Sequence, residues 1–223
     1  MIRAKHTTLG ATGAVLLAVL VGCGGSSEAG GSGGSLSVDR MIELAEKVGE
    51  EGADSCPLPY DAKEAAEAAK VEEAVEPGKA GAAGASADEP VATAEGGKTT
   101  PPQSAWAGKA GAWITCSYHV GGEDLKIHTV GTEAGNTANV LLPTAQSAAG
   151  MTSDEVQAYW QKTDTAKPGE PVPTKGGNVV TVRLSSGGKS DVALLLTVGE
   201  GDKSKLKPEQ VLELAKSFAA QAE

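Results

Sequence analysis

Hydrophobic residues in this chain follow two patterns, one with the period of a helix and one with the period of a strand. In the stretch 37–51, Val38, Met41 and Ala45 recur at the three- and four-residue spacing of one helical face. The same spacing predicts helices at residues 37–51, 62–76, 154–162 and 208–221. Supporting end signals are the capping-box pairs Asp61/Glu64 and Thr152/Glu155, and Pro208 as a first helical residue.

Two other stretches alternate between apolar and polar residues around glycine turns, as β-hairpins do. If Gly121 and Gly122 are the central residues of a two-residue turn, Cys116 pairs with Ile127. In that register one face holds Ile114, Cys116, Tyr118, Leu125 and Ile127, and the other holds Thr115, Ser117, His119, Asp124, Lys126 and His128. A second hairpin is expected from residues 178–184 and 191–198.

These elements predict an α+β fold: an antiparallel sheet built from two β-hairpins, with helices packed on one side. Each hairpin ends its second strand in Thr-Val-Gly and is followed by a helix, which suggests two ββα units. Residues 139–142 are expected to form a short strand or the entry to a turn. Residues 79–111 are almost all small, proline or charged, so we expect a disordered insertion there.

The N-terminal segment has the pattern of a signal peptide. Residues 1–6 contain two basic residues, and residues 9–21 form an uncharged stretch of 13. That length is short for a membrane-spanning helix and typical of the apolar region of a signal peptide. The stretch leads into Leu-Val-Gly-Cys at residues 20–23, which resembles the lipobox of bacterial lipoproteins. The alternative is an ordinary secretory signal, or a membrane anchor, with a chance cysteine.

The lipobox resemblance implies removal of residues 1–22, a diacylglyceryl thioether on Cys23 and acylation of the new amino terminus. Residues 23–35 are then the lipidated cysteine and a flexible Gly/Ser tether, with a root-mean-square span of about 20 Å. Residues 36–223 are expected to form a single extracytoplasmic α+β domain that contains the insertion at about 79–111. We therefore expect a lipid-anchored protein on the extracytoplasmic side of the cell membrane.

Two cysteines remain in the mature chain, Cys56 and Cys116. Outside the cytoplasm an even number of cysteines indicates a disulfide. The Cys-x-x-Cys motif that would suggest a thiol redox enzyme is absent from this sequence. Cys116 lies on the apolar face of the first hairpin, which favours a buried bridge. A pair of reactive thiols is the alternative.

Composition and charge limit the chemistry that this chain can carry out. The formal charge is −10, which excludes a general affinity for nucleic acid. Three histidines, one of them His6, and three cysteines are too few for a multi-ligand metal site, so no metal and no cofactor is expected. The carboxylates are scattered along predicted helices, and no Gly-x-Ser-x-Gly or Ser-x-x-Lys motif is present. We therefore expect no enzymatic activity.

The layout as a whole resembles small secreted lipoproteins of high-GC actinobacteria, many of unknown function. We expect a non-enzymatic binding or accessory module, with another envelope protein or a small ligand as partner. The alternatives are a small-ligand carrier with a sheet–helix pocket, or a secreted hydrolase with a non-standard site. Trp113, Lys126 and His128, on the polar face of the first hairpin, are the candidate binding residues, and a merely solvated strand face is the alternative. Trp160, at helical spacing from Val156, is expected in the core.

Overall fold

Five helices and seven strands make up the described part of the chain. The computed structural model describes residues 35–48, 52–72, 75–82, 92–93, 111–120, 123–133, 135, 137–186, 190–199 and 204–223. The helices are α1 (Val38–Lys47), α2 (Ala62–Ala68), α3 (Thr137–Ala149), α4 (Ser153–Thr165) and α5 (Pro208–Ala222). The strands are β1 (Val75–Ala82), β2 (Ala92–Thr93), β3 (Gly111–Val120), β4 (Glu123–Thr132), β5 (Pro171–Pro173), β6 (Val179–Leu184) and β7 (Asp191–Val198).

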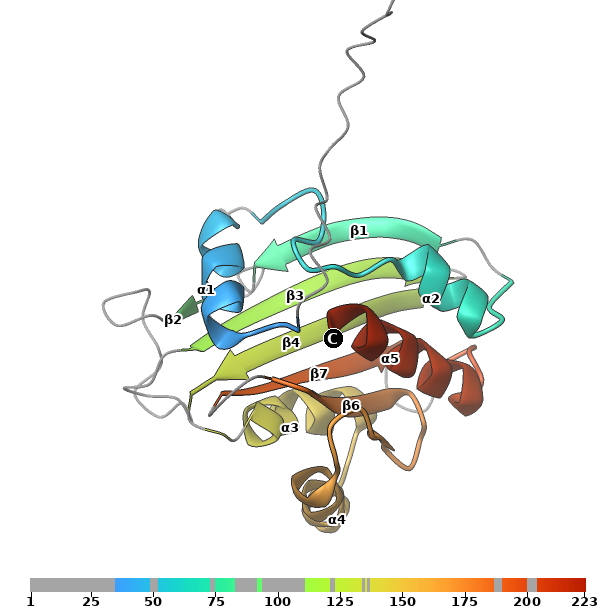
Figure 1. Ribbon diagram of the computed structural model, residues 1–223. Coiled ribbons are helices and arrows are strands. Elements are labelled where there is room, and N and C mark those ends of the chain that lie inside the picture. Colours follow the sequence, from blue (N-terminus) through green and yellow to red (C-terminus); the bar gives the residue numbers. More distant parts are fainter. Residues whose placement is uncertain are drawn as a thin grey trace, which may run out of the picture. The chain divides into compact units, whose positions relative to one another are not determined.

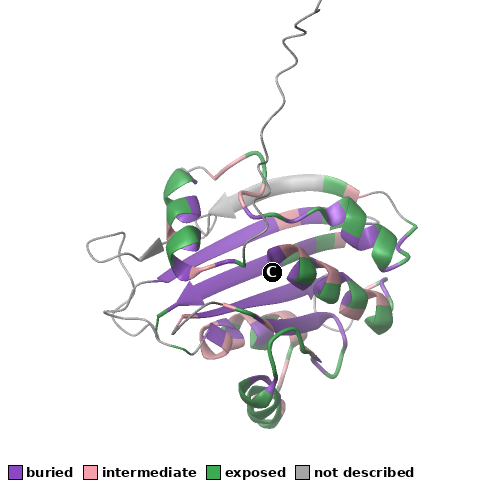
Figure 2. Ribbon diagram, viewed as in Figure 1, coloured by how far each residue is buried: buried purple, intermediate pink, exposed green. Residues whose placement is uncertain are grey.

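The strands form one antiparallel sheet of order β1-β3-β4-β7-β6-β5, and β2 also pairs with β3 (Figure 1). The predicted first hairpin is confirmed in register, because Val120 pairs with Glu123 and Cys116 with Ile127. The second hairpin, β6 and β7, is confirmed as well. The central strands are buried along most of their length (Figure 2), so both faces of the sheet must be covered.

The predicted α+β class is confirmed, and the helices form two layers. On one face, α1, α2 and α5 pack over a large apolar cluster that contains Ile114, Cys116, Leu196 and Phe218. On the opposite face, α3 and α4 pack over a smaller cluster around Val130 and Leu195. We expected helices on one side of the sheet, so the layer of α3 and α4 on its other side was not anticipated. Each hairpin is followed by a helix, as the ββα pattern suggests, but α3 and α5 lie on opposite faces.

Helix α2 is shorter than the sequence predicts: it ends at Ala68, whereas residues 62–76 were expected to be helical. Lys70 takes a left-handed conformation with φ 54°. The N–H of Lys70 donates to the carbonyl of Glu67, and the N–H of Val71 donates to that of Ala66, which closes the helix with a Schellman motif. Val71 is buried by this turn, so tertiary packing outweighs the good helix propensity of the alanine-rich stretch.

Helix α3 occupies the place where a short strand at residues 139–142 was expected, despite Pro143 in its interior. Its first residue is held from outside the helix, because the backbone N–H and the hydroxyl of Thr137 both donate to Asp191 of β7, at 3.0 and 2.8 Å. Its end is a Schellman motif with Gly150 at φ 60°. These two end contacts compensate for the hydrogen bond that the proline removes.

Part of the predicted disordered insertion at residues 79–111 is strand. Residues 79–82 belong to β1 and residues 92–93 form β2, and both pair with β3. Gly111 is the first residue of β3. The other positions of the predicted insertion lie outside the described residues. The expectation was wrong for these strand residues because an edge strand gains its backbone hydrogen bonds from its neighbour and needs few large side chains.

Candidate functional site

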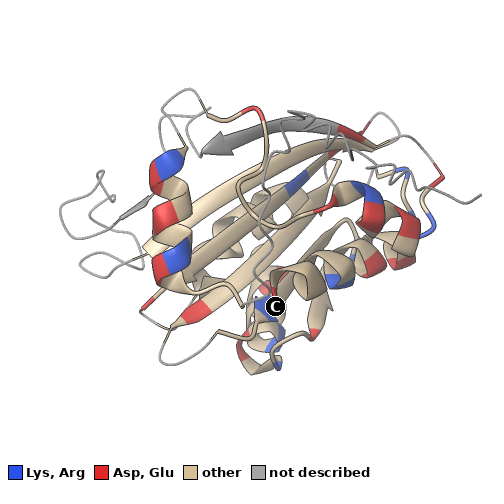
Figure 3. Cartoon of the chain, turned by 45° about the horizontal axis from the view of Figure 1, so that its top comes forward, with Lys and Arg blue, Asp and Glu red and all other residues tan. Residues whose placement is uncertain are grey.

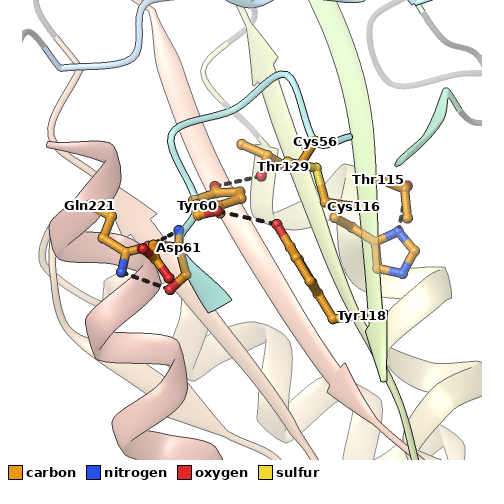
Figure 4. Close-up of a disulfide and its surroundings, with 9 residues drawn as sticks. Cys56, Tyr60, Asp61, Thr115, Cys116, Tyr118, Thr129 and Gln221 are labelled. Atoms are coloured by element: carbon orange, nitrogen blue, oxygen red, sulfur yellow. Dashed lines mark hydrogen bonds between the residues drawn. A yellow bond between two sulfur atoms is a disulfide. The ribbon is translucent and has the colours of Figure 1, made fainter. Parts of the chain in front are cut away.

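The irregular segment 52–61, which we call the strap, leads from α1 to α2 across the apolar face of β3 and β4 (Figure 4). Its Cys56 forms a disulfide with Cys116 of β3, with a Cα–Cα distance of 5.4 Å. The predicted bridge is therefore confirmed. Cys116 is fully buried, so the bond reaches into the core as the hairpin register implied. Leu58 of the strap is buried in the same cluster.

A buried tyrosine docks the far end of the strap. The hydroxyl groups of Tyr60 and Thr129 lie 2.7 Å apart, and the Tyr118 hydroxyl donates to the Tyr60 carbonyl at 3.3 Å. Both tyrosine rings contact Phe218 of α5. Burial raises the pKa of Tyr118 to about 12 and that of Tyr60 still further, so both hydroxyls stay protonated and neutral.

The strap also binds the end of α5 through one amide side chain. Gln221 accepts a hydrogen bond from the N–H of Asp61 at 2.9 Å and donates one to its carbonyl at 3.1 Å (Figure 4). Asp61 in turn caps α2 by accepting from the N–H groups of Lys63 and Glu64. A disulfide, three hydroxyls and an amide thus fix the strap to the sheet and to α5.

The predicted binding residues on the other face of the hairpin do not form an exposed surface. Trp113 is 6% exposed and His128 is 5% exposed, and their rings meet edge to face at 5.9 Å. Lys126 is exposed. The prediction that this face offers a free tryptophan was wrong, because the second layer buries Trp113 in the cluster with Val130 and Leu195. The alternation of the first hairpin did not predict this, but the continuous apolar run at residues 192–196 of β7 is the pattern of a strand covered on both faces.

His128 is held as a neutral side chain. Its Nδ1 lies 2.9 Å from the hydroxyl of Thr115, which is the cross-strand partner expected from the register. Burial lowers the pKa of His128 to about 4, and the charge of Lys126 adds to this effect. Thr115 is itself only 8% exposed. A histidine and a hydroxyl are therefore in contact, but neither is open to a substrate from solvent.

The second described histidine, His119, lies at the exposed end of the hairpin. Its Nδ1 is 2.8 Å from a carboxylate oxygen of Asp124, its expected partner. Both side chains are more than half exposed, so this contact is a surface pair of small energetic value. Among the described residues, no group of three or more His, Cys, Asp and Glu side chains could hold a metal ion.

Trp160 is the residue whose environment the sequence misassigned most clearly. Helix α4 begins as predicted, with a capping box between Thr152 and Glu155. Its buried residues, however, are Tyr159 and Thr163, while Trp160 is 38% exposed. The hydroxyl of Tyr159 reaches the sheet, where it meets Thr181 at 2.7 Å, and this contact determines which side of α4 faces inward.

Cys23 and the lipobox lie outside the described residues, as does the Gly/Ser tether except for Ser35. Within the part of the chain that the structure describes, no helix is long and apolar enough to cross a membrane. Comparison with protein-family models, with curated proteins and with solved structures finds no match to this chain. Its function must therefore be inferred from its own residues.

Proposed function

We propose that this chain is a membrane-anchored extracytoplasmic lipoprotein that acts as a non-enzymatic binding or accessory module. The observation that carries the proposal is the lipobox at residues 20–23, placed directly after a signal-peptide pattern and directly before a Gly/Ser tether. Several acyl chains on one protein hold it at a membrane, whereas a single chain exchanges.

The disulfide supports an extracytoplasmic location for this protein. A bridge between Cys56 and Cys116 persists in oxidising surroundings and is rare in the cytosol. Removing residues 1–22 removes Arg3 and Lys5 and no acidic residue, so the mature charge is 17 − 29 = −12. An acidic body is repelled by anionic lipid, so the acyl chains supply the membrane contact.

The arrangement of polar side chains supports a binding role over catalysis. Thr115 and His128 are buried, and the exposed pair of His119 and Asp124 has no described serine, threonine or cysteine hydrogen-bonded to it. Between the sheet and the layer of α1, α2 and α5, apolar side chains form one continuous cluster. That packing favours a solid scaffold over a carrier with a sheet–helix pocket.

Lipidation is tested by fatty-acid labelling in a bacterial host. Cys23→Ala should abolish labelling and release protein to the medium or leave an unprocessed precursor, because the acyl acceptor is lost. Ser26→Ala, in the tether and outside the lipobox, is the matched control and should be labelled normally. Labelling of Cys23→Ala at the level of this control would refute the anchor.

The accessory role is tested by cross-linking in intact cells, followed by mass spectrometry of the proteins joined to this chain. Wild type and Ser26→Ala should give the same envelope partner, and Cys23→Ala should lose it, because anchoring raises the local concentration of both proteins. A partner recovered equally from all three variants would show that anchoring is irrelevant to binding. Recovery of no specific partner would contradict a binding module.

A further inference from the structure

We draw no further inference here: the strongest candidate, the surface patch around the exposed Trp160 on the outer side of α4, lies on a helix that carries charged residues, as α1, α2 and α5 do (Figure 3), and nothing in the structure shows what covers it.

Discussion

The hydrogen bond between Tyr60 and Thr129 should contribute measurably to stability, because each hydroxyl depends on the other. The two oxygens are 2.7 Å apart, Thr129 is fully buried, and Tyr60 is 8% exposed. Thr129→Val keeps the shape of the side chain and leaves the tyrosine hydroxyl without another hydrogen-bond partner among the described residues. An orphaned buried polar group costs about 1–3 kcal/mol, so Thr129→Val should lower the free energy of unfolding by that amount.

Tyr60→Phe should cost a similar amount, because it orphans the threonine hydroxyl instead. The double variant leaves neither hydroxyl and should cost less than the sum of the single variants by about 1 kcal/mol or more. A matched pair on the other face provides the control. The hydroxyl of Tyr159 meets Thr181 at 2.7 Å but also donates to the carbonyl of Val172 at 3.2 Å. Thr181→Val should therefore cost less than Thr129→Val.

Urea unfolding with the disulfide intact measures these differences, with the transition midpoint interpreted only when the slope m is unchanged. The reasoning fails if the costs of Tyr60→Phe and Thr129→Val simply add in the double variant. It fails equally if Thr181→Val destabilises the protein as much as Thr129→Val does, because the second acceptor of Tyr159 would then be irrelevant.

Three further changes test other parts of the structure. Replacing Cys56 and Cys116 by alanine should lower the free energy of unfolding by about 4 kcal/mol in urea titrations, from the entropy of a loop with a sequence separation of 60. Trp113→Ala should lower the free energy of unfolding by about 3–5 kcal/mol in the same assay, because it removes a buried ring. A near-zero cost would instead mean that Trp113 is exposed on the polar face of the hairpin. Stability should fall by up to about 3 kcal/mol as the pH drops from about 6.5 towards 4. The reason is that His128 takes up a proton in the unfolded state but stays neutral in the folded state, where its pKa is about 4. This loss should be absent in His128→Gln and should persist in His119→Gln.

Local patterns were sufficient to predict the elements whose ends and pairings are set by neighbouring residues. The register predicted from a turn at residues 121–122 is the one in which β3 and β4 pair, and a slip by one residue would have exposed the whole apolar face. The capping box at Thr152 and the first-turn Pro208 located the starts of α4 and α5. The position of Cys116 on the apolar face, together with an even cysteine count, was enough to predict the disulfide.

Contacts between distant segments decided the rest. Helix α3 persists with Pro143 inside it because Asp191, on a strand far along the chain, caps its first residue. The second helical layer changed the environment of both tryptophans. Because α3 and α4 cover the second face of the sheet, Trp113 is buried beneath them, whereas Trp160 lies on the outside of α4. The sequence by itself determined which residues share a face, since that follows from the period of the backbone. Whether a face meets solvent depends on what packs over it, and only the tertiary structure decided that.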